Sequence, residues 1–125
     1  MTIRELVQIL NGEVVAGEDK LDKTVEDFAA TDLLSDILAI EMENYALLTG
    51  LTNAQILRTA EITNACCVVI VRNKQPQQPA ITLARRSGIP LILSPFTMFD
   101  ACCRLSRFLE KQNGGATRTS NPAGT

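Results

Sequence analysis

The chain has 125 residues, enough for one domain, and it is 46% hydrophobic and 21% charged. This balance is typical of a soluble globular chain and excludes a disordered or fibrous one. No apolar stretch is long enough to cross a bilayer, and no cationic start leads into an apolar leader, so we expect a cytoplasmic protein. Histidine is absent, which excludes His-based catalysis and His-ligated metals.

The charges are distributed unevenly along the chain. Residues 1–62 hold 12 acidic and 4 basic side chains, and residues 63–125 hold 2 acidic and 8 basic ones. This asymmetry favours docking of one half on the other, or of one subunit on another. The alternative is that the helices of each half show one sign of charge to solvent. The formal net charge of −2 gives no reason to expect a nucleic-acid partner.

Four cysteines form two adjacent pairs, Cys66-Cys67 and Cys102-Cys103. Neither pair has the two-residue gap of a zinc knuckle or a thioredoxin-type site. Neighbouring side chains point to opposite faces of a strand and diverge by about 100° on a helix. We therefore expect no bound metal or other cofactor, and buried cysteines that pack as small hydrophobic residues. A redox response of the pairs is the alternative.

The first third of the chain predicts a helix and two short extended segments. Thr2 and Glu5 have the spacing of a capping box, and Asn11-Gly12 ends the helix that it opens. A short strand follows at Glu13–Ala16, with its turn at Gly17–Lys20. A second extended stretch covers residues 25–31.

The next helix is short and covers residues 33–40, with Thr31 or Asp32 as its cap. From Tyr45 onward, strands alternate with helices, and Thr52 or Asn53 caps the first of these helices. Pro90 delays the start of the last strand to Leu91 or places that strand at an edge. The expected strands and helices are Tyr45–Thr49, Ala54–Thr63, Cys66–Val71, Ala80–Ser87, Ile89–Leu93 and Met98–Gln112.

This alternation predicts right-handed crossovers and an α/β fold, with a small parallel or mixed sheet and helices on its faces. We expect one domain over residues 1–112. Residues 113–125 are mostly small and polar, which predicts a disordered tail. The last helix has one apolar face, made by Phe99, Cys102, Leu105, Phe108 and Leu109, which we expect to pack into the core. The alternative is that this helix is part of the dimer interface.

Three stretches, in order, resemble the DRTGG domain family. They are the opening helix, turn and strand over residues 2–17, the segment Ala30–Asp36, and the helix–Gly-Ile-Pro–strand unit Ala84–Ser94. The resemblance spans about residues 1–110. Thr31 stands where the family often has glycine, and the string Asp-Arg-Thr-Gly-Gly does not occur.

The resemblance implies a fold like the N-terminal domain of HPr kinase/phosphorylases, similar to that of Mur ligases. Such domains accompany CBS pairs or phosphotransacetylases, or are encoded beside iron hydrogenase systems. The family has no established catalytic residues, and its stand-alone members resemble dimerising accessory or regulatory proteins.

In an open parallel sheet, ligands bind at the carboxyl ends of the strands. Helix N-termini there favour an anion, and Arg72 or Lys74 adds a charge-assisted contact. The alternative is that these polar residues are only caps and turns. The candidate ligand-binding residues are Thr31, Asp32, Thr49, Gly50, Thr52, Asn53, Arg72, Ser94 and Thr97.

No catalytic residue is assigned, because no serine has a histidine partner and no carboxylate lies in an apolar setting. The leading hypothesis is a non-catalytic regulatory or interaction module that works as a homodimer, with another protein as a further partner. The alternative is a sensor of a nucleotide or phosphorylated metabolite. We expect neither a nucleic acid nor a membrane as a partner.

Overall fold

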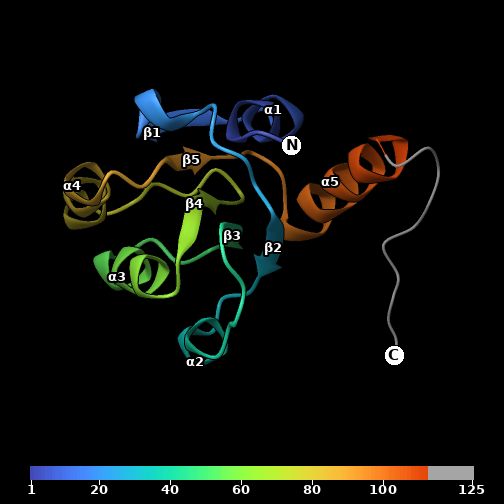
Figure 1. Cartoon of the computed structure of the whole chain (residues 1–125). Coiled ribbons are helices and arrows are strands. Elements are labelled where there is room, and N and C mark those ends of the chain that lie inside the picture. The colour runs from blue at the N-terminus through green and yellow to red at the C-terminus, as the bar shows by residue number, and fades with distance from the viewer. Residues whose placement is uncertain (113–125) are drawn as a thin grey trace.

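A computed structural model describes residues 1–112 as a five-stranded sheet with helices on both faces (Figure 1). The tail predicted over residues 113–125 lies outside the described residues. The elements are α1 (Ile3–Ile9), β1 (Glu13–Ala16), a 3-10 turn (Glu18–Lys20), β2 (Asp27–Ala30), α2 (Leu34–Leu38), β3 (Tyr45–Thr49), α3 (Ala54–Ile62), β4 (Ala65–Ile70), α4 (Gln78–Ser87), β5 (Leu91–Leu93) and α5 (Met98–Gln112).

The strands lie in the order β1-β5-β4-β3-β2, and the sheet is mixed. Strands β2 to β5 are parallel to one another, whereas β1 runs antiparallel to β5. Because each parallel strand lies beside the next one in the sequence, every right-handed crossover falls on the same face. Helices α2, α3 and α4 therefore cover one face, and α1 and α5 cover the other (Figure 1).

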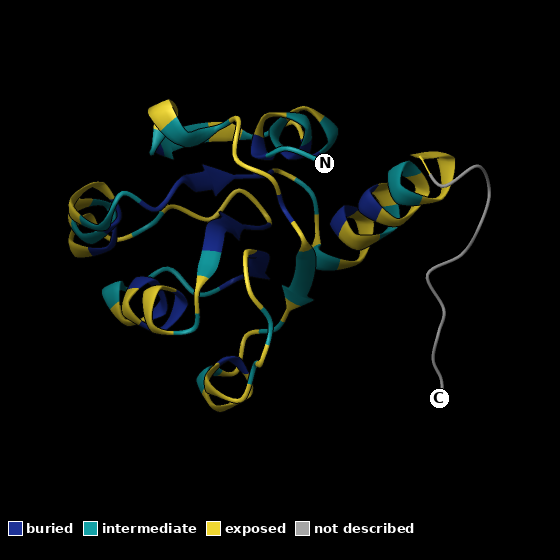
Figure 2. Cartoon of the chain, in the orientation of Figure 1, coloured by how far each residue is buried: buried dark blue, intermediate teal, exposed yellow. Residues whose placement is uncertain are grey.

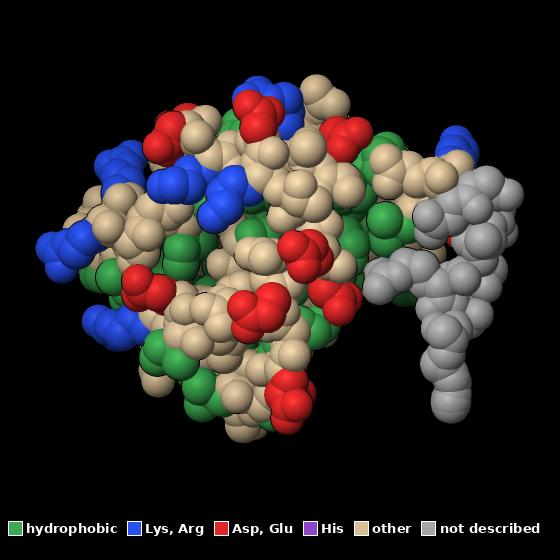
Figure 3. All heavy atoms as spheres, viewed as in Figure 1, with side chains coloured by type: hydrophobic (Ala, Val, Ile, Leu, Met, Phe, Trp, Pro, Cys, Tyr) green, Lys and Arg blue, Asp and Glu red, His purple; other side chains and the backbone are tan. Residues whose placement is uncertain are grey.

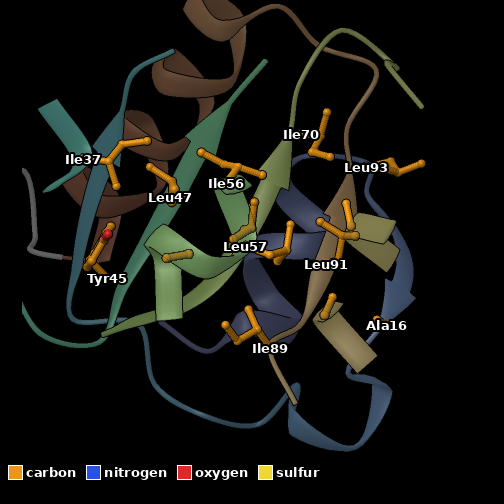
Figure 4. Close-up of a cluster of buried hydrophobic side chains, with 14 residues drawn as sticks. Ala16, Ile37, Tyr45, Leu47, Ile56, Leu57, Ile70, Ile89, Leu91 and Leu93 are labelled. Carbon is orange, nitrogen blue, oxygen red and sulfur yellow. The ribbon is translucent and has the colours of Figure 1, made fainter. Parts of the chain in front are cut away.

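Both faces of the central strands are buried, as the continuous apolar runs predict (Figure 2). On β3, Tyr45 and Leu47 point toward α2, α3 and α4, while Ala46 and Leu48 point toward α1 and α5. Figure 4 shows the first of these two cores, where Ile56 and Leu57 of α3 meet the strands. The sheet is thus the middle layer of three.

Local signals in the sequence predicted several element boundaries correctly. The capping box is present, with Glu5 N donating to Thr2 Oγ1 at 3.2 Å and Thr2 N donating to Glu5 Oε1 at 2.8 Å. Strand β5 begins at Leu91, directly after Pro90. Helix α4 begins at Gln78, two residues earlier than predicted, because the proline that follows Gln78 is well accommodated in a first helical turn.

The prediction for the apolar face of α5 was wrong in part. Phe99 is 75% exposed, and Cys102 is exposed as well, so Cys102 is not a buried hydrophobic residue. Only Ala101 and Leu105 of α5 are buried, four residues apart on one narrow stripe. Helix α5 leans away from the sheet in Figure 1, which leaves the residues beside that stripe uncovered.

Candidate functional site

The carboxyl ends of β2 and β3 are joined by the side chain of Asp32. Its Oδ1 atom accepts hydrogen bonds from Gly50 N at 2.6 Å and from Thr49 Oγ1 at 3.2 Å. The parallel pairing of β2 with β3 brings these residues together, although they are 17 and 18 positions apart in the sequence. The structure thus assembles three of the predicted site residues into one group.

The predicted role of Thr31 or Asp32 as the cap of α2 was wrong. The N-cap position is occupied by Leu33, which makes no side-chain capping bond. Asp32 turns instead toward the neighbouring strand. Thr31 Oγ1 accepts from Leu33 N at 3.1 Å and donates to Asp36 Oδ2 at 3.4 Å, so it orders the turn before the helix.

Lys74, rather than Arg72, supplies the positive charge beside this group. Lys74 Nζ donates to the carbonyl oxygen of Gly50 at 3.3 Å. A Cβ atom at Gly50 would lie 3.3 Å from Asp32 Oδ1 and 3.5 Å from Lys74 Nζ. A larger residue here would press on the Asp32 carboxylate, whereas the distance to Lys74 is that of an ordinary contact.

Arg72 has a different part in the structure. Its backbone lies in the left-handed region at φ 64°, and its N–H donates to Phe96 O at 2.7 Å. The side chain is exposed. Arg72 therefore shapes the loop after β4 through its backbone and leaves its guanidinium to solvent.

Three other predicted residues act as caps or loop supports. Asn53 Oδ1 accepts from Ile56 N at 3.2 Å, so Asn53 and not Thr52 is the cap of α3. Thr97 Oγ1 accepts from Asp100 N at 3.1 Å and caps α5. Thr52 contributes its carbonyl oxygen, which accepts from the backbone N–H of the residue before α4 at 2.9 Å.

Ser94 is fully buried and is used within the fold. Its Oγ donates to Leu10 O at 2.8 Å, at the end of α1, and accepts from Phe96 N at 3.3 Å. Its carbonyl oxygen accepts from Asn73 N at 2.8 Å. Ser94 therefore ties β5 to α1 and to the loop after β4.

Taken together, the polar groups at this edge mostly bond to one another. A backbone N–H after a parallel strand is a place where an anion binds, and here Asp32 already puts a carboxylate on that of Gly50. To bind there, an external anion must displace that carboxylate or overcome the repulsion between the two negative charges. Across residues 1–112, no group of three or more Cys, Asp or Glu side chains gathers as a metal site.

The groups with shifted pKa values on the central strands lie toward the other end of the sheet. Burial raises the pKa of Tyr45, at the start of β3, above its ordinary value. The neighbouring Cys66 thiol, together with burial, raises the pKa of Cys67 well above its ordinary value.

No helix within the described range combines the length and apolar character needed to span a membrane.

A hollow lies between α3 and α4, with a volume of about 260 Å³. We call it the α3–α4 groove. It combines two arginines with two other polar side chains and an apolar remainder. Sequence reasoning missed it, because its two walls come from separate helices. Its lining residues are Ala54, Arg58, Gln78, Pro79, Thr82, Leu83 and Arg86.

The sequence of residues 5–108 matches the DRTGG domain. The chain belongs to the DRTGG domain family. The resemblance seen in the opening helix, in Ala30–Asp36 and in the Gly-Ile-Pro unit was therefore correct.

A solved structure confirms the fold of this DRTGG domain. It contains the CBS and DRTGG domains of the regulatory region of Clostridium perfringens pyrophosphatase, complexed with the activator diadenosine tetraphosphate. The TM-score is 0.69 at 15% sequence identity, over 83% of this chain. The match covers 45% of the other chain, so this chain spans less than half of that regulatory region.

Proposed function

We propose that this DRTGG domain is a non-catalytic regulatory or accessory module that acts through protein contacts as a homodimer. One contrast carries the proposal. The polar groups at the carboxyl edge hydrogen-bond among themselves, while the outer surface of α2 and α3 leaves Leu33, Leu38 and Ile62 more than half exposed. Exposed apolar side chains that share one layer of helices are what a protein-binding surface offers to a partner.

One further observation supports a regulatory role, and another supports the proposed location. The similar solved structure is part of the regulatory region of an enzyme. All four cysteines are unpaired, which fits the cytoplasmic location that we propose for the domain.

Size-exclusion chromatography with light scattering tests the dimer at tens of micromolar protein. We expect the mass of two chains, falling toward that of one chain on dilution. A single-chain mass across the whole range contradicts the dimeric part of the proposal.

The second candidate is a sensor that binds a nucleotide or phosphorylated metabolite at the carboxyl edge. The similar regulatory region is complexed with diadenosine tetraphosphate, which favours a nucleotide as the class of ligand. A thermal-melt screen tests it, because a ligand at 100 times its dissociation constant stabilises a protein by about 2.7 kcal/mol. If no nucleotide or phosphorylated metabolite raises the melting temperature, this candidate is removed.

Variants at the edge locate the ligand if the screen finds one. Asp32→Asn removes the negative charge from beside Gly50 N, so it should tighten anion binding there. Lys74→Ala should weaken the binding, and Arg72→Ala tests the loop arginine that the sequence predicted. Unchanged affinity in all three variants places the ligand elsewhere on the molecule.

A further inference from the structure

The three helices on one face of the sheet form a layer with opposite charges at its two ends. Helix α3 lies between α2 and α4 (Figure 1). No basic residue occurs between Lys23 and Arg58, and no acidic residue occurs between Glu61 and Asp100. The α2 end of the layer is therefore acidic and the α4 end basic. In Figure 3, Lys and Arg side chains gather around α4, while acidic side chains lie over α3 and beside α2.

Among residues 1–112, four large apolar side chains are exposed, and three of them lie on this layer. Leu33 is 57% exposed, Leu38 is 59% exposed and Ile62 is 71% exposed. Leu33 and Leu38 lie at the two ends of α2, and Ile62 ends α3. The fourth large exposed apolar residue, Phe99, lies on α5 across the sheet. Three exposed apolar side chains thus lie on the same layer as the opposed charges.

The α3–α4 groove provides a receptor for an acidic, apolar helix. Its apolar walls come from Ala54, Pro79 and Leu83. Arg58 and Arg86 line it from the two helices, and neither guanidinium makes an ion pair or hydrogen bond within residues 1–112. A carboxylate from outside the chain is the natural partner for two unpaired arginines.

We propose that the outer surface of the α2–α3–α4 layer is the homodimer interface, with α2 of each protomer seated in the α3–α4 groove of its partner. A two-fold axis near α3 turns the layer end for end. The acidic α2 end then faces the partner's basic α4 end, and the reverse contact forms at the same time. Leu38 meets the apolar wall of the groove, and Asp36 faces the partner's Arg86.

This inference rests on the proposed function, because it names the surface through which the domain dimerises. A surface with one sign of charge repels its own copy, whereas a surface with both signs, placed on either side of a two-fold axis, attracts it. Charge complementarity of the layer with itself is the reason for choosing a second copy as the occupant of the groove.

The test uses two single charge reversals, Asp36→Arg and Arg86→Glu. Each variant alone places like charges in both symmetric contacts of its own dimer. We expect the dimer dissociation constant to rise at least about tenfold, which corresponds to roughly 1.4 kcal/mol. The matched controls are Glu110→Arg and Arg107→Glu, which make the same charge changes at exposed positions of α5. Circular dichroism verifies that every variant is folded.

Mixing the two variants gives the decisive result. In the mixed dimer, one contact pairs the introduced arginine of the first variant with the introduced glutamate of the second. The other contact retains the native Asp36 and Arg86. We expect the mixture to dimerise as the native protein does, although each variant alone dissociates. Recovery on mixing requires the two positions to face each other across the interface.

Three outcomes overturn the inference, and they are distinguishable. A native chain that stays monomeric removes the proposed homodimer itself. A native dimer with unaffected charge variants retains the homodimer but moves its interface, and loss of dimer in Phe99→Asp would then assign it to α5. Charge variants that dissociate and do not recover when mixed show that Asp36 and Arg86 do not face each other.

Discussion

The two faces of the sheet are covered to very different degrees. On one face, the nine-residue α3 buries four of its residues, and it has a helix on either side. On the other face, the fifteen-residue α5 buries only Ala101 and Leu105, and among the described helices it packs chiefly against α1. The length of a helix therefore says little about its contribution to stability. The contribution depends on how many of its residues meet the sheet and its neighbours.

The largest expected effect lies on the well-covered face. Leu57 of α3 is fully buried in the core shown in Figure 4. Leu57→Ala should lower the free energy of unfolding by about 2–5 kcal/mol, because it removes buried apolar volume and leaves a cavity. Urea denaturation measures the change. The control is Gln55→Ala, at an exposed position of the same helix, which should stay within about 0.5 kcal/mol.

The equivalent truncation on α5 should have a smaller effect. Leu105 is 4% exposed, but the residues beside it on the helix are open to solvent, so the site can relax around a smaller side chain. Leu105→Ala should lower the free energy of unfolding by about 2 kcal/mol, the low end of the range for such truncations. A loss as large as that of Leu57→Ala would contradict the comparison. Phe99→Ala, at a 75% exposed position, is the control and should have little effect.

Removing a buried hydrogen bond on the α1 side should lower the free energy of unfolding by a similar or smaller amount than Leu105→Ala. Ser94→Ala removes the donor to Leu10 O and the acceptor for Phe96 N. We expect a loss of about 1–2 kcal/mol, because buried polar groups lose their partner. Thermal denaturation measures it, with Ser35→Ala at an exposed position as the control. A native melting temperature in Ser94→Ala would show that the link to α1 contributes nothing.

The smallest effect is a pH dependence on the well-covered face. Burial raises the pKa of Tyr45 above the ordinary value of 10.0. The unfolded chain therefore ionises first, so this contribution to stability is present below pH 10 and is lost as the pH rises through the folded pKa. The chain has one tyrosine, so phenolate absorbance reports Tyr45 alone.

The absorbance titration should run at a higher pH in the folded protein than in denaturant. Tyr45→Phe should remove the signal and the corresponding alkaline fall in stability. Identical titrations of the folded and denatured protein would show that Tyr45 is not shielded by α3 and the strands.

The order of the helices and strands, and many of their boundaries, could be read from local chemistry. The capping box at Thr2 and Glu5 and the delay of β5 by Pro90 both depend on neighbouring residues. Backbone hydrogen-bonding needs at these positions are satisfied within a few residues, so the sequence alone reveals them. The continuous apolar run of β4 likewise predicted a strand buried on both faces.

The candidate site depended on contacts that no local pattern contains. The sequence correctly predicted that Asp32, Thr49 and Gly50 lie at one edge of the sheet, because neighbouring parallel strands end at the same edge. It did not reveal that Asp32 crosses to β3 and bonds to Gly50, or that Lys74 and not Arg72 closes on the same glycine. Those choices depend on distances between strands and loops that are far apart in the sequence.

Local sequence thus determined which segments are helices and strands and which strands are buried on both faces, because burial and capping act within a few residues. Tertiary structure alone decided which apolar groups stay uncovered. Phe99 matched the predicted buried face of α5, and it is exposed because that helix meets the rest of the molecule along one narrow stripe. The α3–α4 groove likewise exists only because two crossovers of the same hand place their helices side by side on one face.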